Sequence, residues 1–423
     1  MDNAILNLKQ EMRDVVENNI LPFWLNKMQD RENCGFYGQM RGDGTLVKEA
    51  SKGGILNARI LWSFSAAYRV LGKPEYLMAA TRAKDYILEH FIDREFGGTY
   101  WELDYMGRPL DTKKQFYAIG FVIYGLSEYA RATHDLESLD YAIQLFHCIE
   151  EHSLDRVNNG YIEACTREWG EIADMRLSDL DANYPKSQNT HLHIIEPYTN
   201  LYRVLQDICS CPKHAEAYAA VKDEVEQALR NLITIFTDRI LNPETHHLDL
   251  FFDMDWKRGA GWLESYGHDI ECSWLMHEAA LVLGDKEVLA KVEPIVQLVA
   301  KASEKGLNAD GSMTHEANLD TGHIDDDRHW WVQAETVVGF FNIYQYFGDE
   351  AALQKCLNCW QYIKDNLIDH ELGEWYWSRD PQRNINLKDD HAGFWKCPYH
   401  NSRMALEIIE RETHPRTLPS REG

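Results

Sequence analysis

Apolar residues recur at intervals of three and four along nearly every long segment of the chain. The stretch from Ile55 to Leu71 shows this spacing, with Ile60 and Phe64 between them. Because a helix completes a turn every 3.6 residues, this spacing is typical of helices. Strand-like alternation is confined to short pieces such as residues 98–102. The pattern therefore predicts a mostly helical protein.

Two kinds of predicted helix alternate in a repeat. An apolar helix is followed by a short break, often Gly-Asp or Gly-Lys-Pro, and then by a more amphipathic helix that ends in an Asp-rich turn. The segments YRVLGKPEYLMAATRAKDYILEHFIDREFGGTYW and YQYFGDEAALQKCLNCWQYIKDNLIDHELGEWYW share this plan. Such self-similarity indicates one supersecondary unit that is used several times.

The repeat predicts six helices of each kind. The apolar helices start near residues 56, 117, 189, 268, 331 and 400. The amphipathic helices start near residues 3, 75, 136, 213, 286 and 350. A helix that is apolar all round is buried, and one with a single apolar stripe covers it. We therefore expect an all-α (α/α)6 barrel, with one barrel domain over residues 1–412 and a polar tail over residues 413–423. An open solenoid would also fit the repeat, but the 423-residue length favours one closed ring.

Charge and hydropathy narrow the classes of partner. The formal net charge is −25 and no Lys/Arg-rich run occurs, which argues against a nucleic-acid partner. No stretch approaches the roughly 18 uninterrupted apolar residues of a membrane span. The N-terminal residues lack the basic region and apolar run of a secretory signal. We expect a monomer in the cytoplasm that binds a neutral small molecule, and neither nucleic acid nor a membrane.

Cysteine and histidine spacing gives little support for a metal or redox site. The nine cysteines are scattered without the spacing of a disulfide framework, so reduced thiols are expected. Cys356 and Cys359 form a single C-x-x-C, which a helix with small buried residues also explains. His191 and His193 have metal-like spacing, but side chains two apart on a helix face away from each other. We expect neither a metal nor a cofactor.

Polar and aromatic side chains stand at the starts of the six apolar helices. They are Arg59, Tyr117, His193, His268, Trp331 with Glu335, and His400. Each inner helix follows the same kind of long loop, so we expect these N-terminal ends to converge on one mouth. Flat aromatic rings, of which the chain has 13 Trp and 21 Tyr, pack against the C–H faces of sugars. The pattern predicts a central funnel for a small polyhydroxylated substrate, without naming a reaction.

The histidines suggest proton transfer. An imidazole titrates near neutrality, so two of them can exchange the roles of proton donor and acceptor. Epimerisation next to a carbonyl needs one group to remove a proton and another to return one to the opposite face, as His268 and His400 could. An arginine such as Arg59 near the carbonyl oxygen would stabilise an enediolate. Glu271, three residues after His268, could orient that imidazole or hold a substrate hydroxyl.

Each of these residues also has a purely structural interpretation. A single histidine at a helix start is often a cap or a surface residue. Arg59 could pair only with a buried glutamate, and one of Trp330 and Trp331 is expected in the core. Other histidines are expected to be solvated in polar loops, namely His246, His247, His323 and His329.

Six sequence blocks resemble a known family. The blocks NTHLHIIEPYTNLYR, GHDIECSWL, WWVQAETVVGF and WKCPYHNSRM are similar to those of cellobiose 2-epimerases, within the wider N-acylglucosamine 2-epimerase superfamily. SKGGILNARILWSFS and KKQFYAIGFVIYGL are similar to N-terminal blocks of that superfamily. The resemblance implies an (α/α)6 barrel without metal or nicotinamide. It also implies the interconversion of glucose and mannose units at the reducing end of β-1,4-linked disaccharides such as cellobiose, lactose and mannobiose.

The resemblance further implies residue roles. His268 and His400 resemble the acid/base pair, and His193 the third histidine, which assists ring opening or hydrogen bonds the sugar. Arg59 resembles the arginine that binds ring or enediolate oxygens. The residues that resemble the substrate-binding shell are Tyr117, Asn189, Glu271, Trp331, Glu335 and Trp395. The loop LSDLDANYPKSQ is a predicted contact for the distal sugar, with Asp181 as its candidate residue.

Three alternatives remain open at the level of sequence. A monosaccharide epimerase or an aldose–ketose isomerase of the same superfamily would share the fold and the enediolate chemistry. An (α/α)6 glycoside hydrolase would use two carboxylates instead of the histidines. A non-catalytic sugar-binding protein would keep the aromatic residues without needing the histidines.

Overall fold

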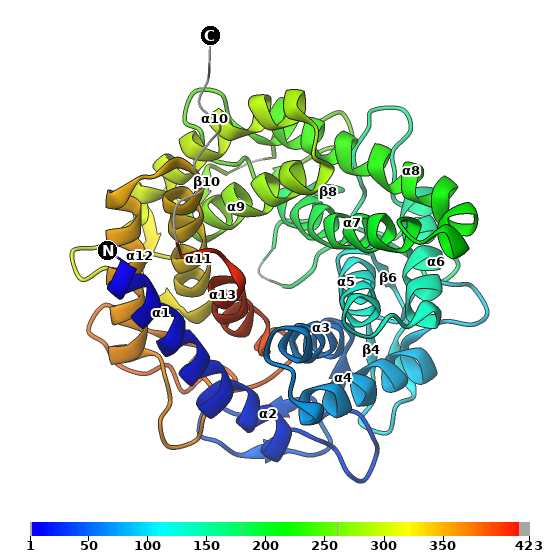
Figure 1. Ribbon diagram of the computed structural model, residues 1–423, viewed down its shortest axis with the longest axis horizontal. Helices are drawn as coiled ribbons and strands as arrows, with labels where there is room; N and C mark the ends of the chain where they lie inside the picture. The colour runs from blue at the N-terminus through cyan, green and yellow to red at the C-terminus, as the bar shows by residue number, and fades with distance from the viewer. Residues whose placement is uncertain (1, 180, 260, 414–423) are drawn as a thin grey trace.

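Two concentric rings of helices make up the computed structural model (Figure 1). The structure describes residues 2–179, 181–259 and 261–413. The predicted polar tail lies outside the described residues except for residue 413, so the division into barrel domain and tail stays a prediction. The predicted all-α (α/α)6 architecture is confirmed.

The inner ring of the described chain consists of six helices, each beginning within two residues of its predicted start. They are α3 (Gly54–Leu71), α5 (Phe116–Thr133), α7 (Gln188–Cys209), α9 (Tyr266–Leu283), α11 (Trp330–Phe347) and α13 (Tyr399–Glu410). The outer ring alternates with it along the chain. Its helices are α1 (Asp2–Val15) with α2 (Leu21–Lys27), α4 (Pro74–Tyr86), α6 (Leu136–His152), α8 (Pro212–Ile235), α10 (Lys286–Ser303) and α12 (Glu350–Asn366). Five-residue π-helical turns extend three outer elements, at Val16–Ile20, Ile87–Phe91 and Phe236–Ile240.

Burial follows the predicted contrast between the two kinds of helix. In α5 every residue from Phe116 to Ala130 is buried, as expected of a helix enclosed on all sides. In α8 the buried residues form one stripe at helical spacing: Val225, Ala228, Leu229, Leu232, Ile233 and Ile235. The inner ring thus forms the core, and the outer ring shields it from solvent.

The Gly-Asp breaks between inner and outer helices have a clear structural reason. Gly284 and Gly348 end α9 and α11 in the left-handed conformation, with φ of 68° and 71°, which glycine adopts without a steric penalty. The next residues, Asp285 and Asp349, accept hydrogen bonds from backbone N–H groups in the first turn of α10 and α12. The dipeptide therefore ends one helix and starts the next.

Short antiparallel ladders join each helix pair to its neighbour. The strand before each of five inner helices pairs with a strand in the loop that follows the next outer helix. These pairs are β3 (Lys52–Gly53) with β4 (Glu102–Leu103), β6 (Lys114–Gln115) with β7 (Ala164–Cys165), β8 (Lys186–Ser187) with β9 (Phe251–Phe252), β10 (Leu263–Ser265) with β11 (Glu316–Asn318), and β13 (Arg328–His329) with β14 (Ser378–Arg379). The other strands are β1 (Gln39–Met40), β2 (Leu46–Val47), β5 (Pro109–Asp111) and β12 (His323–Asp325).

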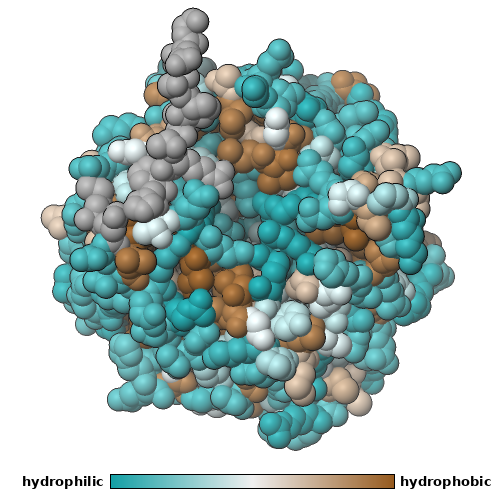
Figure 2. All heavy atoms as spheres, viewed as in Figure 1, coloured by the Kyte–Doolittle hydropathy of each residue, from teal (hydrophilic) through white to brown (hydrophobic). Residues whose placement is uncertain are grey.

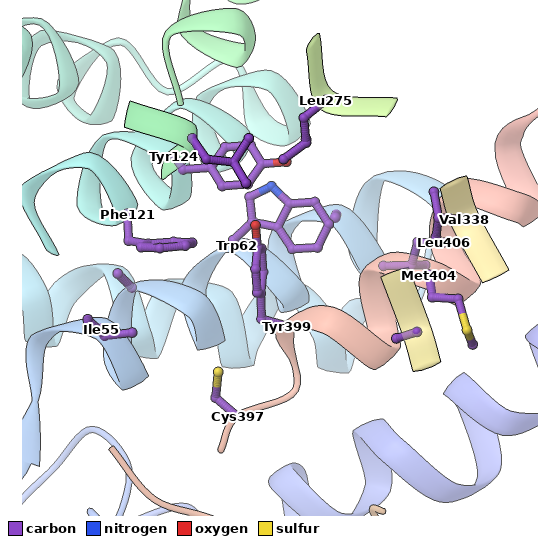
Figure 3. Packing of buried hydrophobic residues seen from close by; sticks show 14 of the residues in the cluster. Ile55, Trp62, Phe121, Tyr124, Leu275, Val338, Cys397, Tyr399, Met404 and Leu406 are labelled. Atoms are coloured by element: carbon purple, nitrogen blue, oxygen red, sulfur yellow. The ribbon is translucent and has the colours of Figure 1, made fainter. Parts of the chain in front are cut away.

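The ring is closed, which excludes the open solenoid. A backbone bridge between Met40 and Ala392 joins the loop before α3 to the segment before α13. Side chains of α13 also pack into the first helices of the ring (Figure 3). The Tyr399 ring lies edge-on to Trp62 at 5.5 Å and to Phe121 at 5.2 Å between centroids. The last inner helix is therefore part of the same core as α3 and α5.

The surface agrees with the hydropathy of the sequence. Figure 2 shows hydrophilic side chains over most of the viewed face, with smaller apolar patches between them. None of the described helices is long and apolar enough to cross a membrane.

Candidate active site

The starts of the inner helices surround a cavity of about 410 Å³. Every predicted site residue except Glu335 lines it: Arg59, Tyr117, Asp181, Asn189, His193, His268, Glu271, Trp331, Trp395 and His400. Most of these side chains stand in the first two turns of an inner helix, and the ladders before those helices hold the turns together. The N-terminal ends of the helices also direct partial positive charge toward the cavity.

His400 is backed by a buried carboxylate. Its Nδ1 lies 2.7 Å from Glu335 Oε1, so the N–H at Nδ1 donates to Glu335 and leaves the lone pair of Nε2 free. Burial lowers the pKa of His400 to about 3, although Glu335 raises it. Burial alone would raise the pKa of Glu335, but Arg403 and His400 lower it to about 2. At neutral pH the pair is therefore a neutral imidazole oriented by a carboxylate anion.

His268 has a different partner from the one that its spacing suggests. Its Nδ1 lies 2.8 Å from the hydroxyl of Ser265, and Glu271 bonds to Arg403 instead. The prediction that Glu271 could orient His268 is therefore wrong, because the carboxylate turns toward the buried guanidinium. Burial, with the nearby His193, lowers the pKa of His268 to about 3, so this imidazole is also neutral at pH 7.

Trp331 lies against both of these imidazoles. Its ring centroid is 4.8 Å from that of His268 and 5.7 Å from that of His400. One indole that lines the cavity therefore contacts both histidines. The neighbouring Trp330 is buried, as the prediction of one core tryptophan required.

His193 is the third histidine of the predicted site, and its side chain is buried. Its Nδ1 lies 3.0 Å from Glu196 Oε2, and its ring contacts Tyr117 at 4.9 Å between centroids. Burial, with Arg59 and Arg403 nearby, keeps the pKa of His193 well below its ordinary value. His191 faces away, because its Nε2 accepts from the N–H of Tyr161, so the two histidines share no ligand position.

Arg59 brings a positive charge to the cavity. Its Nη2 donates to the Tyr117 hydroxyl at 2.8 Å, and its guanidinium lies over the Phe121 ring, 4.2 Å from the centroid. None of the described carboxylates bonds to it, so the alternative of pairing with a buried glutamate is wrong. A cation that lines the cavity without a carboxylate partner can stabilise negative charge on a substrate oxygen.

One buried arginine of the site, Arg403, was not identified from the sequence. Arg403 donates to Glu271 and Glu335 at 2.6 Å each, and also bonds to Glu196 and Tyr399. It thereby joins the carboxylates behind two of the three histidines. The sequence does carry a signal, because Arg403 lies three residues after His400 and Glu196 three after His193, and such pairs share a helix face.

Glu271 can act as a neutral hydrogen-bond donor. Burial and the neighbouring Glu335 raise the pKa of Glu271 well above its ordinary value. Its Oε1 accepts from Arg403, while its Oε2 has no hydrogen-bond partner among the described residues. Glu271 lines the cavity, and within the described chain this buried oxygen is left without a partner beside it.

A second cavity of about 570 Å³ adjoins the first. The two share Asp181, Asn189, His268, His315 and His329 among their lining residues. Asp181 accepts from the backbone N–H and the hydroxyl of Ser178, both at 2.9 Å, which holds its loop at the boundary.

The prediction that four loop histidines are solvated is wrong for His247, which is buried with its Nδ1 2.6 Å from Asp269. His329 is half-buried and lines both cavities. Sequence spacing could not find the partner of His247, because a loop brings it into place. The cysteines of the C-x-x-C, Cys356 and Cys359, are buried thiols of α12, as the helical interpretation predicted.

Comparison with known proteins gives one consistent family. Residues 35–402 match the N-acylglucosamine 2-epimerase (GlcNAc 2-epimerase) family. The chain is 57% identical to a cellobiose 2-epimerase of Bacteroides fragilis over 402 residues, covering 95% of this chain and 98% of that protein. It is 40% identical to a cellobiose 2-epimerase of Ruminococcus albus, with the same coverage. The solved cellobiose 2-epimerase of Bacillus thermoamylovorans superposes with a TM-score of 0.88 at 40% identity, covering 97% of this chain and all of that one.

Proposed function

The chain belongs to the N-acylglucosamine 2-epimerase family, and from this premise we propose how its funnel works as a cellobiose 2-epimerase. The enzyme reversibly converts the reducing-end glucose of a β-1,4-linked disaccharide to mannose. The observation that carries the residue assignment is the convergence on a single cavity of three histidines, two buried and one half-buried, and one arginine without a carboxylate partner among the described residues.

Two imidazoles supply the proton transfers. After the reducing-end ring opens, one of His268 and His400 removes the proton from C2 and leaves a cis-enediolate. Rotation about C2–C3 presents the opposite face of C2 to the other imidazole, which returns a proton. Both rings are neutral at pH 7 and can accept a proton, and Trp331 contacts both of them. The chemistry needs neither a metal nor a nicotinamide, because the histidines carry both protons.

The remaining residues stabilise and orient the substrate. Arg59 would balance the negative charge that develops on the enediolate oxygens. His193 would assist ring opening, with Glu196 holding its Nδ1–H so that Nε2 faces the sugar. Glu271 would donate from its unpartnered oxygen to a sugar hydroxyl. Asn189, Tyr117 and the rings of Trp331 and Trp395 would complete the shell.

The paired cavities favour a disaccharide over a monosaccharide. The reducing-end unit would occupy the cavity that the three histidines line. The second cavity opens from it past Asp181 and Asn189, so a distal sugar would have room beside the first.

Product analysis tests the proposed function. The purified chain is incubated with cellobiose, and the sugars are separated by chromatography. Glucosyl-mannose is the expected product. Free glucose would instead indicate a hydrolase. Unchanged cellobiose would overturn the disaccharide assignment, and mannose, glucose and N-acetylglucosamine would then be tried as substrates.

A further inference from the structure

Three side chains with metal-binding chemistry lie together at the edge of the funnel. They are His315, Asp325 and His329, called the rim cluster below, and one candidate ligand atom from each lies within 4.8 Å of the others. His315 comes directly before β11, Asp325 ends β12, and His329 ends β13. The pairing of β11 with β12 holds the first two positions side by side. The proposed epimerisation uses none of the three.

The geometry of the rim cluster leaves donor atoms available to a metal ion. The imidazoles of His315 and His329 stack with centroids 4.1 Å apart, and His315 Nδ1 lies 2.8 Å from Asp325 Oδ2. Within the described chain, no side-chain hydrogen bond engages the ring nitrogens of His329. The stacked rings and the adjacent carboxylate thus bring two nitrogen donors and one oxygen donor together.

We propose that the rim cluster binds a divalent transition-metal ion such as Zn²⁺. Two imidazole nitrogens and one carboxylate oxygen form a donor set that Zn²⁺, Co²⁺ and Ni²⁺ accept, whereas Mg²⁺ and Ca²⁺ prefer oxygen ligands alone. The stacked rings tilt toward each other on binding, so that a nitrogen of each points at one ion. Both side chains are half-buried and face cavity space, which leaves room for this rotation.

A second cluster of similar composition lies deeper in the funnel but does not suit a cation. Glu271, Glu335 and His400 also bring candidate ligand atoms within 4.8 Å of one another. Both of these carboxylates already accept hydrogen bonds from the guanidinium of Arg403 at 2.6 Å. A divalent ion there would be repelled by a fixed positive charge, which the rim cluster does not contain.

The bound ion inhibits the enzyme by obstructing substrate. His315 and His329 line both the cavity that holds the catalytic histidines and the adjoining second cavity. An ion bound to them, with its water ligands, would therefore stand between the two cavities. The inhibition, unlike the binding, rests on the proposed function. It is competitive with the disaccharide, and removal of the ion by EDTA reverses it.

Calorimetry on the untagged full chain, after EDTA treatment and dialysis, tests the site without any activity assay. Titration with ZnCl2 is expected to show one site per chain, and Co²⁺ to give the visible absorption of a nitrogen- and oxygen-ligated ion. His315→Ala and His329→Ala should each weaken binding at least tenfold. His323→Ala, an exposed histidine on the same hairpin, is the matched control and keeps binding. No stoichiometric binding, or equal affinity in all three variants, would overturn the proposal.

Kinetics with cellobiose test the inhibition separately. Zn²⁺ is expected to raise KM and leave kcat unchanged, and Mg²⁺ to have no effect. Inhibition that persists undiminished in His315→Ala and His329→Ala would place the ion elsewhere and contradict the proposed site. If the metal-free protein does not epimerise cellobiose but still binds Zn²⁺ at the rim cluster, the proposed function fails and the metal site stands.

Discussion

At the scale of single residues, the site separates the groups that face substrate from those that hold them. His193 and His400 each direct Nδ1 toward a buried glutamate, whereas His268 meets only the hydroxyl of Ser265. A carboxylate stabilises a protonated imidazole more than a hydroxyl does. The two members of the proposed acid/base pair therefore differ in environment, which suits proton transfer at two different faces of C2.

Arg403 provides a test of whether the buried groups behind the histidines position them. Lysine keeps the positive charge but lacks the planar fork that reaches Glu271 and Glu335 together. We expect Arg403→Lys to lower kcat by about 10²-fold, the cost of displacing catalytic groups by about 1 Å, with a smaller change in KM.

The measurement is steady-state kinetics across pH, with unfolding curves for each variant. Arg411→Lys changes another arginine, which directly follows α13 and bonds to Glu407, and serves as the control. A folded Arg403→Lys enzyme with unchanged kcat and an unchanged pH profile would show that Arg403 does not position the histidines.

At the scale of elements, four of the repeats are secured by a polar anchor that the sequence did not reveal. Buried lysines from the segments before inner helices reach acidic residues in the turns that follow outer helices. The pairs are Lys52 with Asp30, Lys114 with Asp93, Lys186 with Asp155 and Lys396 with Glu374, each at 2.8 Å. The Asp-rich turn of the repeat thus fixes the loop that precedes an inner helix, and with it the side chains of the funnel.

Breaking one anchor should cost far more than breaking a similar surface pair. Lys52 and Asp30 are fully buried, so Lys52→Met leaves an unpaired buried carboxylate. We expect it to lower the free energy of unfolding by about 3–5 kcal/mol.

Lys48→Met in the same loop breaks an exposed pair with Glu32 that has the same 2.8 Å separation. We expect that change to cost less than about 1 kcal/mol. Urea unfolding of both variants makes the comparison. Equal losses of unfolding free energy in the two variants would refute the anchoring role of the Lys52–Asp30 pair.

The helices and the constellation at their starts could be predicted because both depend on local spacing. The apolar period located the helices, and polar residues such as His268 and His400 stood out within apolar segments. Partners that meet only across the ring could not be predicted. Arg403 touches glutamates from three other helices, and His247 reaches Asp269 through a loop whose path no periodicity encodes.

At the scale of the whole molecule, closure of the ring makes one core and one funnel. The bridge from Met40 to Ala392 completes the circle of ladders, so side chains from all six inner helices face one cavity. The same closure buries many titratable groups, and stability should therefore depend on pH.

His191 shows the sign of this dependence. Its Nδ1–H donates to the carbonyl of Ser187 and its Nε2 accepts from the N–H of Tyr161, which only the neutral ring can do. Burial lowers its pKa to about 4, whereas the unfolded chain has a value of about 6.5. The unfolded state therefore binds a proton first, and stability falls as pH drops from about 6.5 to 4.

We expect His191 alone to contribute about 3 kcal/mol to this loss. Urea unfolding at neutral and acid pH measures it. His191→Gln should lower stability at neutral pH but flatten the decline, and His370→Gln, at an exposed histidine, controls for the loss of an imidazole. A His191→Gln variant that declines as steeply as the wild type would contradict the assignment.

The measurement that tests the central claim most directly is proton NMR of cellobiose incubated with the EDTA-treated enzyme in heavy water. We predict a mannose-type reducing end with deuterium at C2, because the proton that one imidazole removes is replaced from solvent. His268→Ala and His400→Ala should each lower this conversion by about 10²–10⁴-fold. Conversion that retains the original C2 proton, or that survives the loss of either histidine, would contradict the account.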